Sequence, residues 1–394
     1  MNSETQISLG SRLKGIMQKY SMYIFLVVIA VVFQILTDGT LMRPLNITNI
    51  ILQNSYILIL AIGMMILIIL GHIDLSVGSV MAFVGAIASK MMIENGMNVW
   101  LSVFVCLIVG ALIGAFQGFW VAYVKVPAFI ATLAGMLLFR GLTIVVTGGK
   151  SIGPFPQAFQ YISSGFIPDL LSGSGIHIFS LVAVIVMLLF MNFMAVRKRS
   201  KRKKNGIDVE SSTWFFMKMA TTDIVLIGFT FLLAQYEGIP NILVILAVLI
   251  FIYNFITTKT VVGRQIYAIG GNEKASKLSG VNTRFTTFAM FVNMGILAAV
   301  SGLVFAARLN AATANAGQGF ELDAIASCYI GGASAYGGVG TITGAIIGGL
   351  VMGLLNNGMS LLGVGVDWQQ AIKGIVLLLV VAFDIYNKSK TETN

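Results

Sequence analysis

Acidic side chains are the first candidates for chemistry in this chain, because a carboxylate held away from water can bind a cation or relay a proton. Asp74 lies in the stretch GHIDLSVGS (Gly71–Ser79), directly after a long apolar run and close to His72, one of only two histidines. Glu321 and Asp323 likewise stand where an apolar segment begins, and none of the fifteen acidic residues is expected near the centre of such a segment. A proton- or sodium-driven carrier usually needs an ionisable group there, so this distribution argues against one.

A structural role explains these acids better than a reactive one. Asp74 and Ser76 can accept hydrogen bonds from the free N–H groups of a helix that begins near Val77, and Gly78 lets that helix pack closely. The residues assigned to this helix-cap and hinge class are Asp74, Ser76, Gly78, Glu321 and Asp323. We expect His72 to be a wet or interfacial side chain near the same end of the helix.

Uncharged polar side chains, by contrast, fall inside or at the edge of apolar segments. They are Asn54, Gln117, Thr132, Asn293, Asn356 and Asn357. A path for a neutral, hydroxyl-rich solute needs such hydrogen-bonding groups without strong fixed charge. The alternative is that they join neighbouring helices, with about 0.6–2 kcal/mol for each bond. Arg140 is the one cation well inside a segment, and it either reaches outward to the membrane surface or pairs with a carbonyl.

The stretch from 257 to 283, TTKTVVGRQIYAIGGNEKASKLSGVNT, is the most informative polar piece. Its two adjacent glycines are expected to break the chain. Asn272 is a good N-cap, Glu273 suits the first helical turn, and Gly280 is a C-terminal stop. The sequence therefore predicts a short amphipathic helix that lies along the membrane surface as a docking element. Its residues are Gly270, Gly271, Asn272, Glu273, Ala275, Ser276, Lys277, Leu278 and Gly280.

The composition indicates that a bilayer surrounds most of the chain. Of 394 residues 57% are hydrophobic and only 10% are charged, whereas soluble domains average about 25% charged residues. The net charge of +10 fits an excess of lysine and arginine in cytoplasmic loops better than nucleic-acid binding. The basic run RKRSKRKK (197–204) is interpreted in the same way, as an orientation anchor, with binding to acidic lipid as the alternative.

The hydropathy pattern predicts an all-α membrane protein, a polytopic bundle of about twelve helices. The expected helices lie near 21–37, 47–70, 77–93, 99–124, 127–147, 176–196, 215–235, 240–256, 286–307, 320–336, 341–362 and 367–387. With both termini in the cytoplasm, eighteen lysines and arginines fall on inner segments and three on outer ones, as the positive-inside rule requires. This layout puts GHIDLSVGS at the cytoplasmic face. The likeness of 76–87 to 338–349 predicts a parallel internal repeat.

Glycines recur at a spacing of four in two of the expected helices. One set is Gly110, Gly114 and Gly118, and the other is Gly340, Gly344 and Gly348. Such faces let helix backbones approach closely in lipid. They serve either packing within the chain or an interface between subunits.

Five stretches carry a resemblance to a known family. They are IDLSVGS (73–79), KVPAFIATLAGMLLFRG (125–141), GRQIYAIGGNEKASKLSGVN (263–282), ELDAIASCYIGGASAYGGVGT (321–341) and LNNGMSLLGV (355–364). Together with the order of the helices, the chain resembles the permease subunits of bacterial ATP-binding-cassette importers for monosaccharides. The additional pair of helices around 197–204 resembles the longer xylose and multiple-monosaccharide members.

The resemblance implies a division of labour. Residues 270–280 are implied to be the coupling helix that contacts a separate ATPase subunit, which would hold ATP and Mg²⁺. This chain contains no GxxxxGK[ST] motif, so it is expected to be no enzyme and to bind no cofactor. The other implied partners are an extracytoplasmic sugar-binding protein, either periplasmic or lipid-anchored, a second permease subunit in a homodimer, a monosaccharide and the bilayer, with no nucleic acid. The competing hypothesis is a proton-coupled carrier or passive channel that works alone.

The expected organisation follows from these assignments, in the plasma (inner) membrane of a bacterium. It comprises a cytoplasmic N-terminus (1–20), a first transmembrane half (21–196), a basic cytoplasmic loop (197–214), two additional transmembrane helices (215–256), a cytoplasmic coupling loop (257–285), a second transmembrane half (286–387) and a cytoplasmic tail (388–394).

Overall fold

The described part of the chain is built from helices. The computed structural model describes residues 9–171 and 175–392, and within them the only β-type pairing is two isolated bridges. The first half contains α1 (Leu9–Leu36), α2 (Pro44–Ile69), α3 (Val77–Ser89) with the π-helical turn η1 (Lys90–Glu94), α4 (Val99–Phe119) with the π-helical turn η2 (Trp120–Val124), α5 (Ala128–Thr147) and α6 (Gln157–Ser164). The remainder contains α7 (Ile178–Lys204), α8 (Ser212–Ala234), α9 (Asn241–Lys259), α10 (Val261–Gly271), α11 (Glu273–Leu278), α12 (Thr283–Leu309), α13 (Phe320–Ile330), α14 (Ile342–Leu361) and α15 (Val366–Glu392). The predicted all-α fold is confirmed.

Nine helices of the described residues are long and apolar enough to cross a membrane. They are α2, α3 with η1, α4 with η2, α5, α7, α8, α9, α12 and α14. Each of the twelve predicted segments contains a helix, but the one expected at 320–336 is only the 11-residue α13. A helix of that length rises about 16 Å, roughly half of the hydrocarbon thickness. The prediction of a full helical span there is wrong.

Helix α2 forms the centre of the bundle. It packs against α12, α14, α13 and α9, so it has neighbours on several sides. Its sequence is apolar on every face, which is the pattern of a helix surrounded by others, and Met64 and Met65 are fully buried. Movement of α2 must therefore displace several other helices.

Both predicted glycine faces are used inside the chain. A Cβ added at Gly110 or Gly114 would overlap the backbone of α12, and one at Gly344 or Gly348 would overlap the backbone at the end of α13. The small-residue spacing therefore lets α4 approach α12, and α14 approach α13, at backbone distance.

The segment 310–341 crosses the bundle mostly without helix. Phe320, the first residue of α13, stacks on Tyr56 in the middle of α2 with 4.9 Å between ring centroids. Further on, the Gly338 amide donates to the carbonyl of Ile69 at the end of α2 (2.8 Å). Arg140 donates to the Ala316 carbonyl (2.6 Å), so this cation pairs with a carbonyl and ties α5 to the segment.

The start of α13 therefore lies midway along α2 and not at a membrane surface. Glu321 and Asp323 occupy its first turn. The prediction that no acid lies at mid-depth is wrong, because the non-helical residues before α13 carry the chain halfway across before the helix begins. That geometry depends on close approach: a Cβ on Gly317 would overlap the backbone of Gly78, at the start of α3.

Replacing Gly78 with alanine is expected to destabilise the protein by about 1–3 kcal/mol. The new methyl group would overlap the Gly317 carbonyl and the Glu321 carboxylate, and a backbone atom cannot rotate away. The apparent melting temperature of the detergent-solubilised protein measures the effect. Gly141→Ala is the matched control, since Gly141 is also helical and its Cβ would meet nothing within 4 Å. Equal melting temperatures for both variants would contradict this packing.

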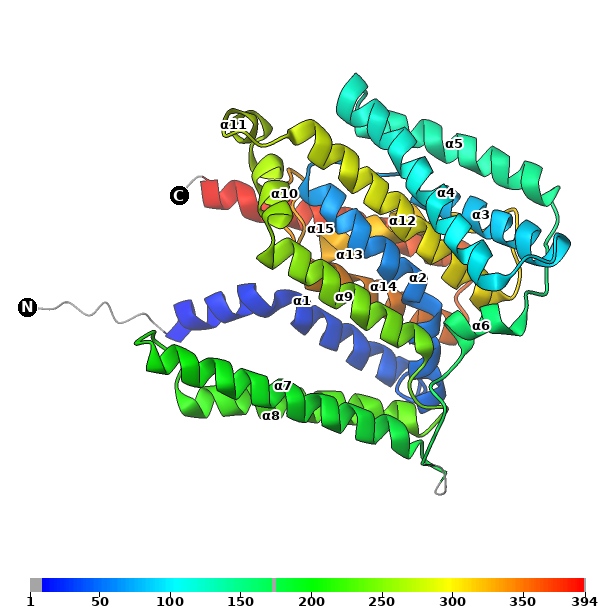
Figure 1. The fold of residues 1–394 in the computed structure, drawn as a ribbon. Coiled ribbons are helices and arrows are strands. Elements are labelled where there is room, and N and C mark those ends of the chain that lie inside the picture. Colours follow the sequence, from blue (N-terminus) through cyan, green and yellow to red (C-terminus); the bar gives the residue numbers. More distant parts are fainter. Residues whose placement is uncertain (1–8, 172–174, 393–394) are drawn as a thin grey trace, which may run out of the picture.

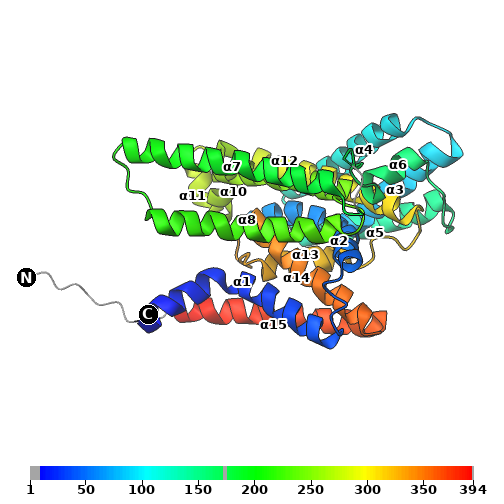
Figure 2. The same ribbon diagram turned by 90° about the horizontal axis from the view of Figure 1, so that it is seen from below.

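The segments predicted to be cytoplasmic lie together at one end of the molecule, as the charge pattern predicts. Figure 1 shows α11, the α7–α8 connection, the start of α1 and the end of α15 at one end of the bundle, with α6 at the other. The basic run expected as part of a loop is instead helical, since α7 continues through Lys204. In both views α7 and α8 form a pair along one edge of the bundle (Figure 2). The parallel internal repeat stays a prediction.

Candidate functional site

The short helix α11 is built as its sequence predicts. The Asn272 side chain accepts a hydrogen bond from the Ala275 amide (2.9 Å), Glu273 stands in the first turn, and Gly280 adopts a positive φ of 83° just after the end. One detail differs: Gly270 does not break the chain, because α10 runs through Gly271. The turn comes at Asn272, whose extended backbone separates the two helices.

The α10–α11 unit is held directly against the core. A Cβ on Gly270 would overlap the carbonyl oxygen of Ile69, so α10 lies in backbone contact with the end of α2. The Tyr267 hydroxyl donates to the Gly340 carbonyl just before α14 (2.7 Å). These contacts join the α10–α11 unit to the end of α2 and to the start of α14.

The outer surface of α11 presents an unusual apolar side chain. Leu278 is 90% exposed, although it ends a capped helix that the structure holds in a defined position. Ser276 is buried, while the other predicted docking residues from Gly271 onward are exposed. Among the large apolar side chains of the described residues, Leu278 is the most exposed.

A pocket of about 420 Å³ lies beside α11. Its lining includes His72, Lys125 and Glu273, and the Lys125 ammonium stands 3.4 Å from the Glu273 carboxylate. Burial lowers the pKa of His72, so the imidazole is neutral at neutral pH. Both partners of the ion pair are about half exposed, so its contribution to stability is small.

A polar groove lies between α2, α13, α14 and α15 and reaches from the middle of α2 toward the end of the bundle opposite α11. One pocket of about 270 Å³ is lined by Asn54, Tyr56 and Asn356, among others, and a neighbouring one of about 380 Å³ by Glu321. Both pockets share Asp323, together with Lys373 from α15. The Asn356 side-chain oxygen and one Glu321 oxygen are buried with no hydrogen-bond partner in the described residues. Both atoms are shielded from solvent, so they are polar groups that the packing beside the groove leaves unsatisfied.

The ion pair between Asp323 and Lys373 was missed by the sequence reasoning. The Lys373 ammonium contacts both Asp323 carboxylate oxygens, at 2.9 and 3.1 Å. The two side chains are only 8% and 22% exposed, respectively. The sequence did contain a signal for this ion pair, namely two opposite charges in apolar segments 50 residues apart. No spacing rule could join them, because their meeting depends on how α13 packs against α15.

Of the six side chains proposed to line a path, the groove brings together only Asn54 and Asn356. The other four join parts of the bundle, which is the alternative that the sequence left open. Gln117 donates to Ser76 Oγ (2.7 Å), Thr132 accepts from the Leu75 amide (3.1 Å), Asn293 accepts from the Tyr253 hydroxyl, and Asn357 exchanges two bonds of 2.9 Å with Asn46.

The predicted cap at the start of α3 takes a different form. Asp74 accepts from the Ser76 amide (2.8 Å) and hydroxyl (2.6 Å), and the Ser76 side chain makes no cap bond to the helix. The carboxylate thus fixes the residue before the helix and not the helix amides. Asp74 is 3% exposed and Gly78 abuts Gly317, so from Asp74 onward this stretch runs into the bundle. His72, before it, lies beside Glu273 of α11 at the cytoplasmic end, where the sequence predicted it.

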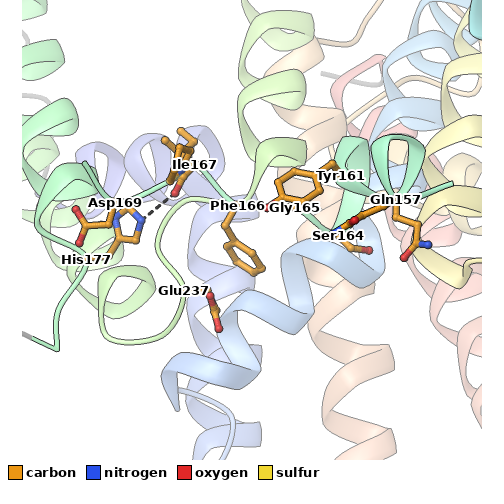
Figure 3. A pocket seen from close by; sticks show the side chains of 11 residues that line it. Gln157, Tyr161, Ser164, Gly165, Phe166, Ile167, Asp169, His177 and Glu237 are labelled. Carbon is orange, nitrogen blue, oxygen red and sulfur yellow. Dashed lines mark hydrogen bonds between the residues drawn. The ribbon is translucent and has the colours of Figure 1, made fainter. Parts of the chain in front are cut away.

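The opposite end of the molecule carries an open polar pocket of about 500 Å³. Figure 3 shows His177 and Asp169 on one side and the α6 side chains Tyr161 and Ser164 on the other. One ring nitrogen of His177 bonds the Ile167 carbonyl (2.8 Å), which fixes the loop that precedes α7. The pocket therefore has a defined shape on the face away from α11.

Fold and site together define a polytopic membrane protein with a polar groove inside the bundle and a short, ordered helix exposed at one end, features that suit a transport permease. Residues 46–198 and 200–381 match the family described as branched-chain amino acid transport system/permease component. The chain belongs to this family, and it is a multi-pass protein of the bacterial inner membrane.

Curated relatives cover nearly the whole chain. The xylose transport system permease protein XylH of Haemophilus influenzae is 41% identical over 380 residues, which is 96% of this chain and 99% of the relative. The protein of the same name from Escherichia coli K12 is 38% identical over 375 residues, 95% of this chain and 93% of its own. The ribose import permease protein RbsC of that organism is 34% identical over 371 residues, 94% of each. No solved structure matches the chain.

Proposed function

We propose that this chain is the permease subunit of an ATP-driven importer and forms the membrane path for a monosaccharide. The observation that carries the proposal is the construction of α11: Leu278 is exposed for a partner, while Gly270 ties the same unit to the end of α2. Helix α2 also contributes Asn54 to the groove. One helix thereby links the docking surface to the groove.

The partners proposed follow from this arrangement. An ATPase subunit would bind Leu278 and its neighbours on α11, and ATP and Mg²⁺ would reside on that subunit, since this chain lacks a phosphate-binding motif. A sugar-binding protein would approach the opposite face, where Tyr161 and Ser164 border the open pocket. A second copy of the permease would complete the assembly. ATP then drives the path between two packings by stabilising one of them by a few kcal/mol.

The proposed substrate class is a monosaccharide of the xylose, arabinose, galactose, glucose or ribose type. Neutral sugars are recognised by groups that donate and accept hydrogen bonds, and the groove contains such groups in Asn54, Asn356, Asp323 and Lys373. The names of the relatives, xylose and ribose permeases, support the same class.

A second candidate function is a proton-coupled carrier that works alone. Asp323 at mid-depth is the observation that favours it, because carriers of this kind use a carboxylate there. Its pairing with Lys373 at 2.9 Å weighs against that role, since a proton taken up by the carboxylate would leave a largely buried ammonium without its partner.

Uptake into proteoliposomes separates the two functions. The chain is reconstituted with its proposed ATPase and sugar-binding protein, and radiolabelled xylose and ribose are offered with and without ATP. We expect uptake to require ATP and both partners, and to ignore an imposed pH gradient. Uptake by the chain alone that follows the pH gradient would overturn the importer and establish the carrier.

A further inference from the structure

The α7–α8 pair encloses a pocket of about 610 Å³ at the basic end of α7. The two helices contact each other more than they contact the bundle, and Asn192 of α7 donates to the Asp223 carboxylate of α8 (2.8 Å). Figure 2 shows the pair running alongside the bundle out to the end where α11 lies. The pocket therefore opens beside the bundle, where lipid and cytoplasm meet.

The structure divides the basic run into two faces. Lys198, Arg199 and Arg202 line the pocket, whereas Lys201 and Lys204, on the same helix, do not. For an anchor that only orients the chain, the number of positive charges matters, and the face of the helix on which they lie does not. The division therefore indicates a role for the pocket-facing cations beyond orientation.

The charges inside the pocket are incompletely balanced. Lys218 of α8 pairs with Glu210 (2.8 Å), and Arg199 stacks on Phe215 with its guanidinium 4.6 Å from the ring centroid. The side chains of Lys198 and Arg202 make no hydrogen bond or ion pair with any described residue. These two cations, one helical turn apart, are available for an anion that enters from outside.

The remaining lining indicates which anion fits. The basic end holds four cationic side chains against the carboxylates of Asp208 and Glu210, so it keeps an excess of positive charge. Toward the membrane the lining includes the apolar side chains of Met191, Ala195 and Met219. Trp214, beside it on α8, is 49% exposed, as expected of an aromatic side chain at the headgroup level. An amphiphile with an anionic head and an acyl chain matches both ends, whereas a nucleic acid or an acidic peptide matches only one.

We propose that the pocket between α7 and α8 binds the headgroup of an anionic phospholipid. Lys198 and Arg202 contact the phosphate, and an acyl chain lies along the apolar lining. Since α8 also packs against the central helix α2, a bound lipid would stabilise the packing of the α7–α8 pair against α2.

The experiment uses Trp214 as a reporter of bound lipid. Three substitutions, W100F, W120F and W368F, leave it as the single tryptophan, and the chain is reconstituted in phosphatidylcholine with brominated phosphatidylglycerol or brominated phosphatidylcholine. We expect the quenching of Trp214 fluorescence to saturate at a lower content of brominated phosphatidylglycerol than of brominated phosphatidylcholine. The double variant K198Q/R202Q should weaken that preference about tenfold or more, because it removes the charge-assisted hydrogen bonds to the phosphate as well as the surface attraction.

The matched control K201Q/K204Q removes the same two charges from outside the pocket and should weaken the preference clearly less, because those cations add only the general attraction of a basic surface. An equal loss in both double variants would show general attraction to the surface and overturn the site, as would no loss in either. Should the single-tryptophan chain fail to fold, the rise in melting temperature on adding phosphatidylglycerol to detergent-solubilised protein replaces quenching. The same two double variants are compared by this measurement, and an equal loss in both, or no loss in either, again overturns the site.

Discussion

Replacing Leu278 with aspartate is expected to abolish most ATP-driven uptake while leaving the permease folded. The side chain is 90% exposed, so the fold loses no packing. If Leu278 is buried against the ATPase, its removal costs about 1.5–3 kcal/mol of binding, and a buried carboxylate costs more. ATPase affinity should then fall about tenfold to a hundredfold or more. Binding of the purified ATPase to the reconstituted permease and initial uptake rates measure the two effects.

Ile207→Asp is the control for this variant. Ile207 is also exposed, at 48%, and lies in the α7–α8 connection at the same end of the molecule but away from α11. We expect it to retain uptake and ATPase binding. If Leu278→Asp binds the ATPase and transports as well as Ile207→Asp does, α11 is not the docking helix.

Removing one partner of the Asp323–Lys373 pair is expected to have the second large effect. Asp323→Asn leaves a largely buried ammonium unpaired, and breaking such a pair costs about 3–5 kcal/mol. Melting temperature should therefore fall steeply. The double variant Asp323→Asn with Lys373→Met removes both charges and should recover most of the stability. If the pair contacts the sugar in the groove, uptake should stay lost in the double variant.

Uptake and stability thus separate the two roles of the pair. A double variant that is stable and transports normally would mean that the pair only joins α13 to α15. The exposed Lys90–Glu94 pair, with both side chains more than 40% exposed, is the control. Neutralising it should change stability by less than about 0.5 kcal/mol and leave uptake intact.

Local patterns predicted much of the architecture because they depend on neighbours in the chain. The lengths of the apolar segments predicted the long helices, because in lipid the backbone N–H and C=O groups of a segment must form hydrogen bonds within that segment. Asn272, Glu273 and Gly280 gave the capped docking helix, since a cap involves residues only two to four positions apart. The glycines at a spacing of four gave close helix faces, although the pattern could not say whether the partner was α12 or another subunit.

The depth at which α13 begins in the bundle was decided by tertiary packing alone. Phe320 begins a helix beside Tyr56 because the residues before it enter the bundle unwound, which requires the backbone contact of Gly317 with Gly78. A hydropathy pattern counts apolar residues and cannot detect a helix that starts halfway across. For the same reason it put Glu321 and Asp323 at a surface.

By itself, then, the sequence determined the all-α membrane class, the end at which the charges gather and the capped helix α11. Composition and charge act on the chain as a whole, and caps act between near neighbours. Only the tertiary structure brought Asp323 to Lys373, 50 residues apart, and joined Asn54 and Asn356 in one groove. The physical reason is that a polar path is a property of helix faces that meet. Which faces meet depends on side-chain shape across the whole bundle, with Gly270 against Ile69 as one contact among many.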